Sequence, residues 1–381
     1  MSRILHVPTV SWTPHEGVSR AIAELASATP WHEHHVFAAA CDTTADEIFD
    51  RVVVQPGWMG SATFTSAVRD LIVTERPDIV HLHGGALVPL LAASPYLRDV
   101  PVVATIYGPL VPLRDRNAGL GTLLHARGAS VSPLQVLVTS LIGPALGRWA
   151  LRSGRIATVC TPDPLVEKAL SGAGRVVAAR GAASIGPHRA AWSDPPTIGF
   201  AGRAERGRGV EDLVAAFELV TQQVEGVRLR LLLLHGRRDG WVARLERMPG
   251  VDVVMGGCDD LARELASCQV VALPFRRSMT MTPTLVAAEA LAAGVPVVGT
   301  DVPCLTPLLT DRVTGRIVRR GDVPALADAL RWVLADRERW ARLSAAAIDH
   351  IADEWSWSGA ALGIDEVYSQ VCKEQELHDA Y

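Results

Sequence analysis

Residues 197–213 read TIGFAGRAERGRGVEDL, which predicts an apolar strand, a loop rich in glycine and arginine, and the start of a helix. Glycines let such a loop turn tightly and approach a ligand. Arg203 and Arg208 add cations beside a helix N-terminus, where free amides already favour an anion. The loop has neither the G-K-[ST] of a P-loop nor a G-x-G-x-x-G fingerprint. It predicts a diphosphate site, and a solvated, merely arginine-rich turn is the alternative.

A second helix start is predicted in residues 273–300, LPFRRSMTMTPTLVAAEALAAGVPVVGT. Pro283 suits the first helical position. The amides of Thr284 and Leu285 would then point toward an anion. Glu289 follows among alanines, where an unpaired carboxylate is costly, so we expect a ribose diol as its partner. The alternative is a carboxylate satisfied by a neighbouring arginine or by the backbone.

The same alternation of strands and helices continues along the whole chain and predicts two doubly wound parallel sheets, an α/β fold. Strands are expected at residues 4–7, 35–39, 79–83, 102–107, 156–160, 197–201, 229–234, 251–254, 270–273 and 297–300. Helices are expected at residues 18–28, 210–224, 285–293 and 323–334.

The proline-rich segment IGPHRAAWSDPP, residues 185–196, interrupts this periodicity. We therefore expect an N-terminal acceptor-side domain over 1–185, a linker over 186–196 and a nucleotide-sugar-binding domain over 197–350. A C-terminal helix over 351–381 is expected to pack back on the first domain. Because ligands bind beyond the carboxyl ends of parallel strands, the site is expected between the two halves.

Composition excludes several classes of protein. The 381 residues are 49% apolar and 20% charged with a formal net charge of −4, which is typical of a globular chain and not of a nucleic-acid binder. The six cysteines are scattered and the N-terminus lacks a signal peptide, so a cytoplasmic protein is expected. The uncharged segment 129–147 contains prolines and favours a buried helix; an interfacial surface framed by Arg127, Arg148 and Arg152 is the alternative.

At this point the chain resembles a known family. GFAGRAERGRGVEDLVAAF, together with P-x(14)-E-A-x-A-x-G-x-P-V-V from Pro274, resembles the retaining family-4 glycosyltransferases. EGVSRAIAELA, PDIVHLHGG, PVVATIYG and WSWSGAALGIDEVY support the resemblance along the whole length. The resemblance implies the GT-B fold, in which two Rossmann-like domains face each other across a cleft.

The resemblance also implies donor contacts. Arg203 and Arg208 are similar to the catalytic pair that binds the diphosphate, with arginine at 208 where the family usually has lysine. Gly17 resembles the loop glycine that approaches the phosphate, and Met255 and Gly256 resemble the wall beside the base. The full set of implied donor contacts is Gly17, Arg203, Arg208, Met255, Gly256, Met281, Thr282, Pro283, Thr284, Leu285 and Glu289.

Two positions depart from the family pattern. Met281 stands where a glutamate normally contacts the transferred sugar, and Tyr107 stands where an acceptor-side histidine is usual. Tyrosine donates a hydrogen bond but is no base near neutral pH. With Tyr107, we expect His81 and His83 on the acceptor side, because they alternate on one strand and face the same way. A structural role for these histidines is the alternative.

No metal site is expected. The run His32-Glu33-His34-His35 is expected at a turn that enters a strand, and no D-x-D occurs in the sequence. Arginines and helix dipoles would carry the leaving-group charge instead, with no cofactor besides the nucleotide-sugar co-substrate.

The expected function is transfer of a sugar from a UDP- or GDP-type donor to a small-molecule or glycan acceptor, with retention of configuration. Natural-product (antibiotic) tailoring and envelope glycan or glycolipid assembly are the competing pathways. A non-catalytic nucleotide-sugar-binding or auxiliary subunit, and an epimerase or phosphorylase, are the competing activities. No nucleic-acid partner is expected, peripheral membrane contact is not favoured, and the sequence gives no indication of the oligomeric state.

Overall fold

The computed structural model describes residues 1–9, 12, 17–41, 43–56, 62–85, 87–108, 133–203, 206–233, 240–256, 260–277 and 282–379. The chain forms two compact units. Unit 1 comprises Met1–Gly181, Thr280–Thr282 and Trp357–Tyr381, and unit 2 comprises Ala182–Met279 and Pro283–Ser356. The units divide between Gly181 and Ala182, upstream of the segment 186–196 that the sequence indicates as a linker.

Unit 1 is built on a seven-stranded parallel sheet in the order β3-β2-β1-β4-β5-β6-β7. Its strands are β1 (Arg3–Pro8), β2 (Glu33–Ala38), β3 (Arg51–Val54), β4 (Ile79–Gly84), β5 (Val102–Ile106), β6 (Thr158–Thr161) and β7 (Arg175–Ala178). Its helices are α1 (Gly17–Ala28), α2 (Ala62–Glu75), α3 (Val88–Ala92), α5 (Pro133–Arg152), α6 (Pro164–Leu170) and α13 (Trp357–Asp379), with short 3-10 turns η1 (Thr43–Glu47) and η2 (Pro95–Leu97).

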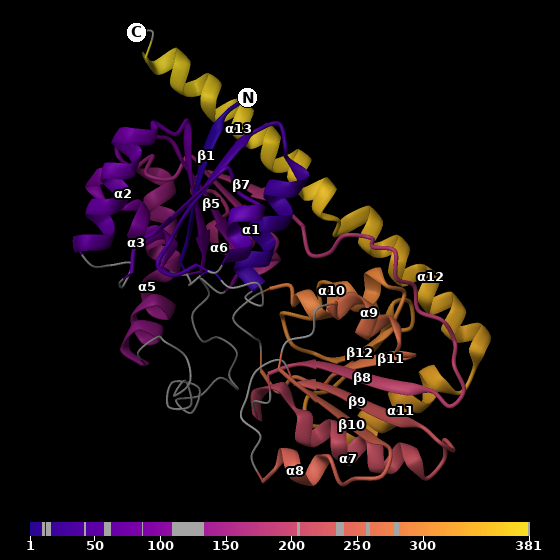
Figure 1. Cartoon of the computed structure of the whole chain (residues 1–381). Helices are drawn as coiled ribbons and strands as arrows, with labels where there is room; N and C mark the ends of the chain where they lie inside the picture. Colours follow the sequence, from indigo (N-terminus) through magenta and orange to yellow (C-terminus); the bar gives the residue numbers. More distant parts are fainter. Residues whose placement is uncertain are drawn as a thin grey trace. The chain divides into compact units, whose positions relative to one another are not determined.

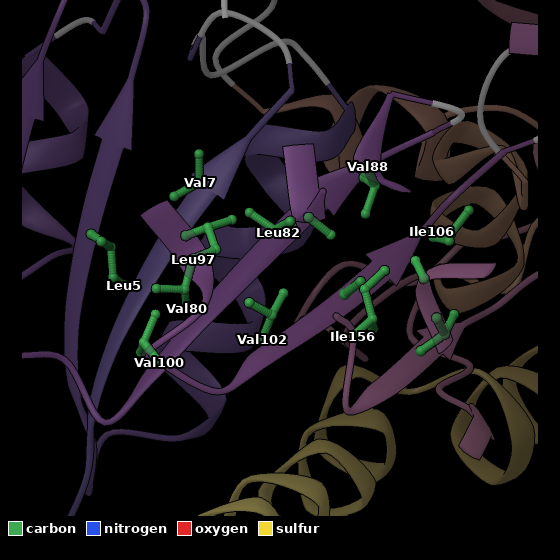
Figure 2. Close-up of a cluster of buried hydrophobic side chains, with 14 of the residues drawn as sticks. Leu5, Val7, Val80, Leu82, Val88, Leu97, Val100, Val102, Ile106 and Ile156 are labelled. Atoms are coloured by element: carbon green, nitrogen blue, oxygen red, sulfur yellow. The ribbon is translucent and has the colours of Figure 1, made fainter. Parts of the chain in front are cut away.

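Apolar side chains cover both faces of this sheet, because alternate residues of each strand point to opposite sides. One face packs against α2, α3, α5 and α6, and Figure 2 shows Leu5, Val80 and Val102 within that cluster. The other face packs against Leu25 of α1 and several side chains of α13. Two covered faces explain why the central strands are nearly continuous apolar runs.

The last part of the chain differs from the prediction of one helix over 351–381. Instead, α12 (Arg337–Glu354) ends in unit 2 and α13 begins at Trp357 in unit 1. Within unit 1, α13 packs against α1 and places Tyr368 in the core (Figure 1). A Cβ added at Gly181 would lie only 2.3 Å from the Cε3 atom of Trp357, so the Trp357 ring occupies the space beside this glycine. One face of the sheet of unit 1 is therefore covered partly by α13, which is distant in the sequence from the strands.

Unit 2 has a six-stranded parallel sheet in the order β10-β9-β8-β11-β12-β13. Its strands are β8 (Thr197–Gly202), β9 (Arg228–Leu233), β10 (Val251–Met255), β11 (Val270–Leu273), β12 (Val297–Thr300) and β13 (Gly315–Val318). Besides α12, its helices are α7 (Val210–Thr221), α8 (Val242–Leu245), α9 (Leu261–Ala266), α10 (Leu285–Ala292) and α11 (Val323–Leu334), with the 3-10 turn η3 (Arg206–Arg208). The doubly wound α/β class expected from the sequence is confirmed in both units.

The long uncharged segment forms part of α5, whose side chains are described from Gly143 onward. There Gly147 and Ala150 are buried on one side of the helix, whereas Arg148 and Trp149 are exposed on the other. Among the described residues, no helix has both the length and the apolar content needed to cross a bilayer.

Candidate functional site

The strand order of unit 2 places its candidate site. β8 pairs with β9 on one side and with β11 on the other, so the direction of strand order reverses between β8 and β11. Ligands of doubly wound sheets bind at such a switch point, beyond the carboxyl ends of the strands. Arg203 directly follows β8, and Pro274 directly follows β11. The sequence-predicted arginines therefore lie at the favoured edge.

The loop after β8 is held against the segment after β11. Gly209 has φ +69°, and a Cβ there would lie 1.9 Å from the carbonyl oxygen of Pro274. The amide of Arg276 donates to the carbonyl of Gly207 at 3.0 Å. Only glycine combines this backbone conformation with so close an approach. The close approach fixes the position of the loop relative to the N-terminus of α7.

We expect Gly209→Ala to lower the free energy of unfolding by at least about 2 kcal/mol, because it adds left-handed strain to a backbone clash. Gly207→Ala is the matched control: a Cβ added there would have Arg277 Nε, at 3.7 Å, as its nearest neighbour in the described part of the chain. Urea unfolding of both variants checks this, and equal stabilities would contradict it.

Around Arg208 the structure adds two residues that the sequence did not predict. The Arg208 guanidinium lies over the Phe275 ring, 5.0 Å from its centroid. Arg276 pairs with the buried carboxylate of Asp212 in the first turn of α7, with Nε–Oδ2 at 2.7 Å, and the Asp212 side chain raises the pKa of Arg276. Arg276 thus neutralises an acidic residue beside the candidate anion site. The available signal was the R-R pair at 276–277, which follows β11 after two intervening residues.

We expect Arg208→Lys to retain function but to lower kcat/KM about three- to tenfold, because lysine keeps the charge and loses the stacking on Phe275. Steady-state kinetics with the preferred donor measures this. A loss as large as that of Arg208→Ala would show that charge is not the main contribution.

The helix start after β11 differs in detail from the prediction. α10 begins at Leu285 with Thr284 as its N-cap, so Pro283 precedes the cap and is not the first helical residue. The Thr284 amide donates to the carbonyl of Cys304 at 3.2 Å and is not available to an anion. Among the described residues, no acceptor is recorded for the amides of Leu285 and Val286, which belong to the first turn. The predicted amide pair therefore moves by one residue, to Leu285 and Val286.

Glu289 lies on the same side of this helix. Val286 and Glu289 are the partly exposed residues of α10, whereas its other residues are buried. Residues three apart share one helix face. Glu289 therefore lies on the same partly exposed side as Val286, although its Oε2 atom is buried.

The two residues that are predicted to lie beside the nucleotide base are at the edge of the same sheet. Met255 is the last residue of β10 and is half-buried, and Gly256 is exposed with φ +93°. β10 is an edge strand that runs parallel to β9 and β8, so Met255 shares the carboxyl edge with Arg203. Met281 lies outside the described residues.

In unit 1 the corresponding switch point lies between β1 and β4. Gly17 is the first residue of α1, whose first turn has no acidic residue. Thr282 is predicted to contact the donor, but its amide donates to the carbonyl of Tyr107 at 2.6 Å and its side chain bonds to Asp163. Its polar groups therefore already have partners inside unit 1.

The predicted histidines are buried and differ in their partners. His81 bonds through Nδ1 to the Tyr368 hydroxyl at 2.5 Å and through Nε2 to Thr105 at 2.7 Å. His83 bonds through Nδ1 to the Tyr107 hydroxyl at 3.2 Å. Burial lowers the pKa of His81 to about 3 and that of His83 well below its usual value, so both rings are neutral near pH 7. Only His83 of this pair contacts the predicted acceptor-side residue Tyr107.

His6 is a further buried histidine that the sequence did not predict. Ligand atoms of His6, His81 and His83 lie within 4.8 Å of one another, a spacing that suits a metal ion. Both ring nitrogens of each histidine, however, already have hydrogen-bond partners. In the run 32–35, the histidines also have separate partners: His32 bonds to Asp365 and His35 to Glu33.

Two family descriptions match the chain. "Glycosyl transferases group 1" matches residues 195–336, and "Glycosyltransferase Family 4" matches residues 15–142. The first match contains the β8 loop and α10, and the second contains β4 and β5.

Two curated relatives are D-inositol 3-phosphate glycosyltransferases. The protein from Xylanimonas cellulosilytica is 37% identical over 192 residues, which cover 48% of the chain and 44% of the relative. The protein from Nocardia farcinica is 30% identical over 185 residues, which cover 46% of the chain and 40% of the relative. The chain thus spans less than half the length of these two relatives.

Solved structures match over nearly the whole length. A sucrose-phosphate synthase from Thermosynechococcus elongatus aligns with a TM-score of 0.73 at 18% identity, covering 97% of the chain and 99% of that protein. Anabaena HepE in complex with UDP-glucose aligns with a TM-score of 0.71 at 17% identity, covering 97% of the chain and 100% of that protein. At such identities the likeness establishes the fold.

Proposed function

The chain belongs to the group 1, family 4 glycosyltransferases, and on that premise we propose that it moves a sugar from a nucleotide-diphosphate sugar to an acceptor hydroxyl with retention of configuration. The observation that carries this proposal is the arrangement of residues at the carboxyl ends of β8 and β11. There an arginine–glycine loop, held by its contact with Pro274, adjoins the carboxyl end of the strand that leads to α10.

The reaction needs positive charge where the diphosphate leaves. We assign this role to Arg203, Arg208 and the amides of Leu285 and Val286, which supply charge and dipoles without a metal ion. For Gly17, at the start of α1 in unit 1, phosphate binding stays a prediction from the sequence. The acceptor attacks the face from which the diphosphate departs, and the departing phosphate oxygen takes the acceptor proton.

The remaining contacts follow from position. Glu289 accepts hydrogen bonds from the ribose diol, because it shares the partly exposed face of α10 with Val286. Met255 and Gly256 flank the base. For Met281, which lies outside the described residues, a contact with the transferred sugar stays a prediction from the sequence. Pro283, before the N-cap of α10, shapes the approach to this helix start.

We propose a uridine or guanosine diphosphate donor. The HepE neighbour was solved with UDP-glucose, which supports the uridine form. The acceptor is proposed to be a small hydroxylated molecule, with natural-product tailoring as the first pathway to test, because Met281 replaces a polar contact to the sugar. A reducing compartment such as the cytoplasm is supported by the free cysteines of the described part of the chain, which are Cys41, Cys160, Cys268, Cys304 and Cys372.

A thermal-shift panel of nucleoside diphosphates tests the donor site. The cognate nucleotide should stabilise the protein by about 2.7 kcal/mol at a hundredfold excess over its Kd. Donor consumption, with and without candidate acceptors, then tests transfer. Binding without turnover of any donor would favour an auxiliary subunit, and no binding at all would refute the site.

A further inference from the structure

A row of buried histidines crosses the sheet of unit 1. The register sets His34 of β2 beside Ile4, and His6 of β1 beside His81 of β4. His6 and His34 therefore share a sheet face with His81 and with His83, two residues further along β4. α1 and α13 cover this face, and all of these rings are buried.

Hydrogen bonds connect this row from Thr29 to Tyr107. His34 Nε2 lies 2.9 Å from the carbonyl oxygen of Thr29, and His34 Nδ1 lies 2.9 Å from His6 Nε2. His6 Nδ1 lies 2.9 Å from His83 Nε2, and His83 Nδ1 lies 3.2 Å from the Tyr107 hydroxyl. Each ring uses both of its nitrogens, so the bonds form one unbranched chain.

The Thr29 end fixes the direction of this chain. A carbonyl oxygen only accepts hydrogen bonds, so His34 Nε2 must carry the hydrogen. The Thr29 hydroxyl, 3.1 Å from the same nitrogen, donates its own hydrogen to the carbonyl of Leu25 and is also an acceptor here. Two independent acceptors therefore assign the His34 tautomer.

The remaining tautomers follow in order. Burial lowers the pKa of His6, His34 and His83, so each neutral ring carries one hydrogen. His34 Nδ1 then accepts from His6 Nε2–H, and His6 Nδ1 accepts from His83 Nε2–H. His83 Nδ1 is left as an acceptor and takes the hydrogen of the Tyr107 hydroxyl, whose pKa is raised by burial.

We infer that His34, His6 and His83 are positioning residues that commit the Tyr107 hydrogen inward, so that the oxygen of this buried side chain can act toward a ligand only as an acceptor. Tyr107 directly follows β5, at the carboxyl edge where doubly wound sheets bind ligands. The ligand group at this position is then a donor, such as a hydroxyl or an ammonium group, and not a carboxylate or phosphate. This ligand preference rests on the proposed function, whereas the tautomers do not.

Other groups near the row fit this assignment. His81, on the same face, bonds to Tyr368 and Thr105 and takes no part in the chain. Burial is the main cause of the raised pKa of Tyr107, and a side-chain hydrogen bond with Thr105 acts in the opposite direction. The Cys160 thiol of β6 is neutral, because burial raises its pKa to about 12.

Nuclear magnetic resonance of the full chain with ¹⁵N-labelled histidine tests the tautomers without any substrate. At pH 7.5 we expect His6, His34 and His83 to be neutral with hydrogen on Nε2 only, with signals assigned by single His→Gln variants. Hydrogen on Nδ1 of His6 or His83, or a doubly protonated ring in the row, would overturn the inference. Stoichiometric Zn²⁺ bound by His6, His81 and His83 would overturn it as well.

His34→Leu removes the acceptor of His6 Nε2–H and should leave His6 and His83 as mixtures of tautomers. His35→Leu is the matched control: His35 is the neighbouring buried residue on β2, but it bonds to Glu33 and not to the row. It should leave the tautomers of the row unchanged. Unchanged tautomers in folded His34→Leu would contradict the relay, and the wild-type spectrum decides the question if this variant does not fold.

Kinetics with the nucleotide sugar that is turned over tests the effect on the ligand. Tyr107→Phe and His34→Leu should each lower kcat/KM about threefold to tenfold, mainly through KM, as for one lost hydrogen bond. The double variant should be no worse than Tyr107→Phe, because the row acts through that hydroxyl. Additive losses would overturn the positioning role. Absence of turnover would refute the proposed function and leave the tautomer assignment to the spectra.

Discussion

Arg203→Ala is expected to lower kcat/KM by about a hundredfold to a thousandfold, equivalent to about 2.7–4 kcal/mol of transition-state stabilisation. Arg203 follows β8 at the switch point of the sheet, where charge develops as the diphosphate departs. The loss should appear mainly in kcat, because the leaving group gains charge only in the transition state. Steady-state kinetics with saturating acceptor measures it.

Arg228→Ala is the matched control for this variant. Arg228 is an exposed arginine at the first residue of β9, at the amino edge of the same sheet. It should keep the wild-type kcat/KM. An unchanged kcat/KM in folded Arg203→Ala would remove this arginine from the mechanism.

Mild acid is expected to destabilise unit 1 strongly. His6, His81 and His83 have folded-state pKa values below their ordinary 6.5, about 3 for His81, because burial disfavours the charged ring. Folding therefore favours the neutral rings. Above pH 6.5 the rings are neutral in both states. As the pH falls below 6.5, the unfolded chain binds protons that the folded chain does not, and the free energy of unfolding decreases. Each ring should lower the free energy of unfolding of unit 1 by about 2 kcal/mol at pH 5, and the three rings together by about 6 kcal/mol.

Hydrogen exchange at pH 7.5 and pH 5, corrected for the intrinsic rates, checks this. Protection of β1, β2 and β4 should fall at pH 5, while that of β8, β9 and β11 should persist. The carboxylates of Asp311 and Asp336 in unit 2 have pKa values lowered from 3.8, so their contributions are lost only at still lower pH. Equal protection of β4 at both pH values would contradict the assignment of neutral buried rings.

The sequence predicted the interior of both sheets because their central strands are continuous apolar runs buried on both faces. The strands it missed, β3, β7 and β13, are edge strands of four residues. Their residues are largely half-buried or exposed, so no long apolar run marks them. Edge strands depend on one neighbour, and local sequence carries little of that information.

The candidate site could be proposed from the sequence where one short segment contains the charged residues. Arg203, Arg208 and Glu289 stand out by charge beside a glycine loop or among alanines. Phe275 could not be predicted as a stacking partner, because its contact with Arg208 depends on the pairing of β8 with β11. The register of the helix start was wrong for a similar reason, since Cys304 occupies the Thr284 amide from a distant loop.

His6 was missed because one histidine in an apolar strand gives no local signal. Its importance comes from the register of three strands, which aligns it with His34 and His83. A histidine run such as residues 32–35 attracts attention in the sequence, yet its members have separate partners in the structure. Side-chain networks across strands are thus the part of a site that sequence patterns report least.

The position of α13 has a consequence for how the protein is made. Residues Ala182–Met279 and Pro283–Ser356 form unit 2, so nearly all of its chain leaves the ribosome in one continuous stretch. Unit 1 includes the first 181 residues, but the part of its sheet that α13 covers stays exposed until Tyr368 and its neighbours have been translated. We therefore expect the second unit to mature first, and the nascent first unit to depend on chaperones until α13 has been translated.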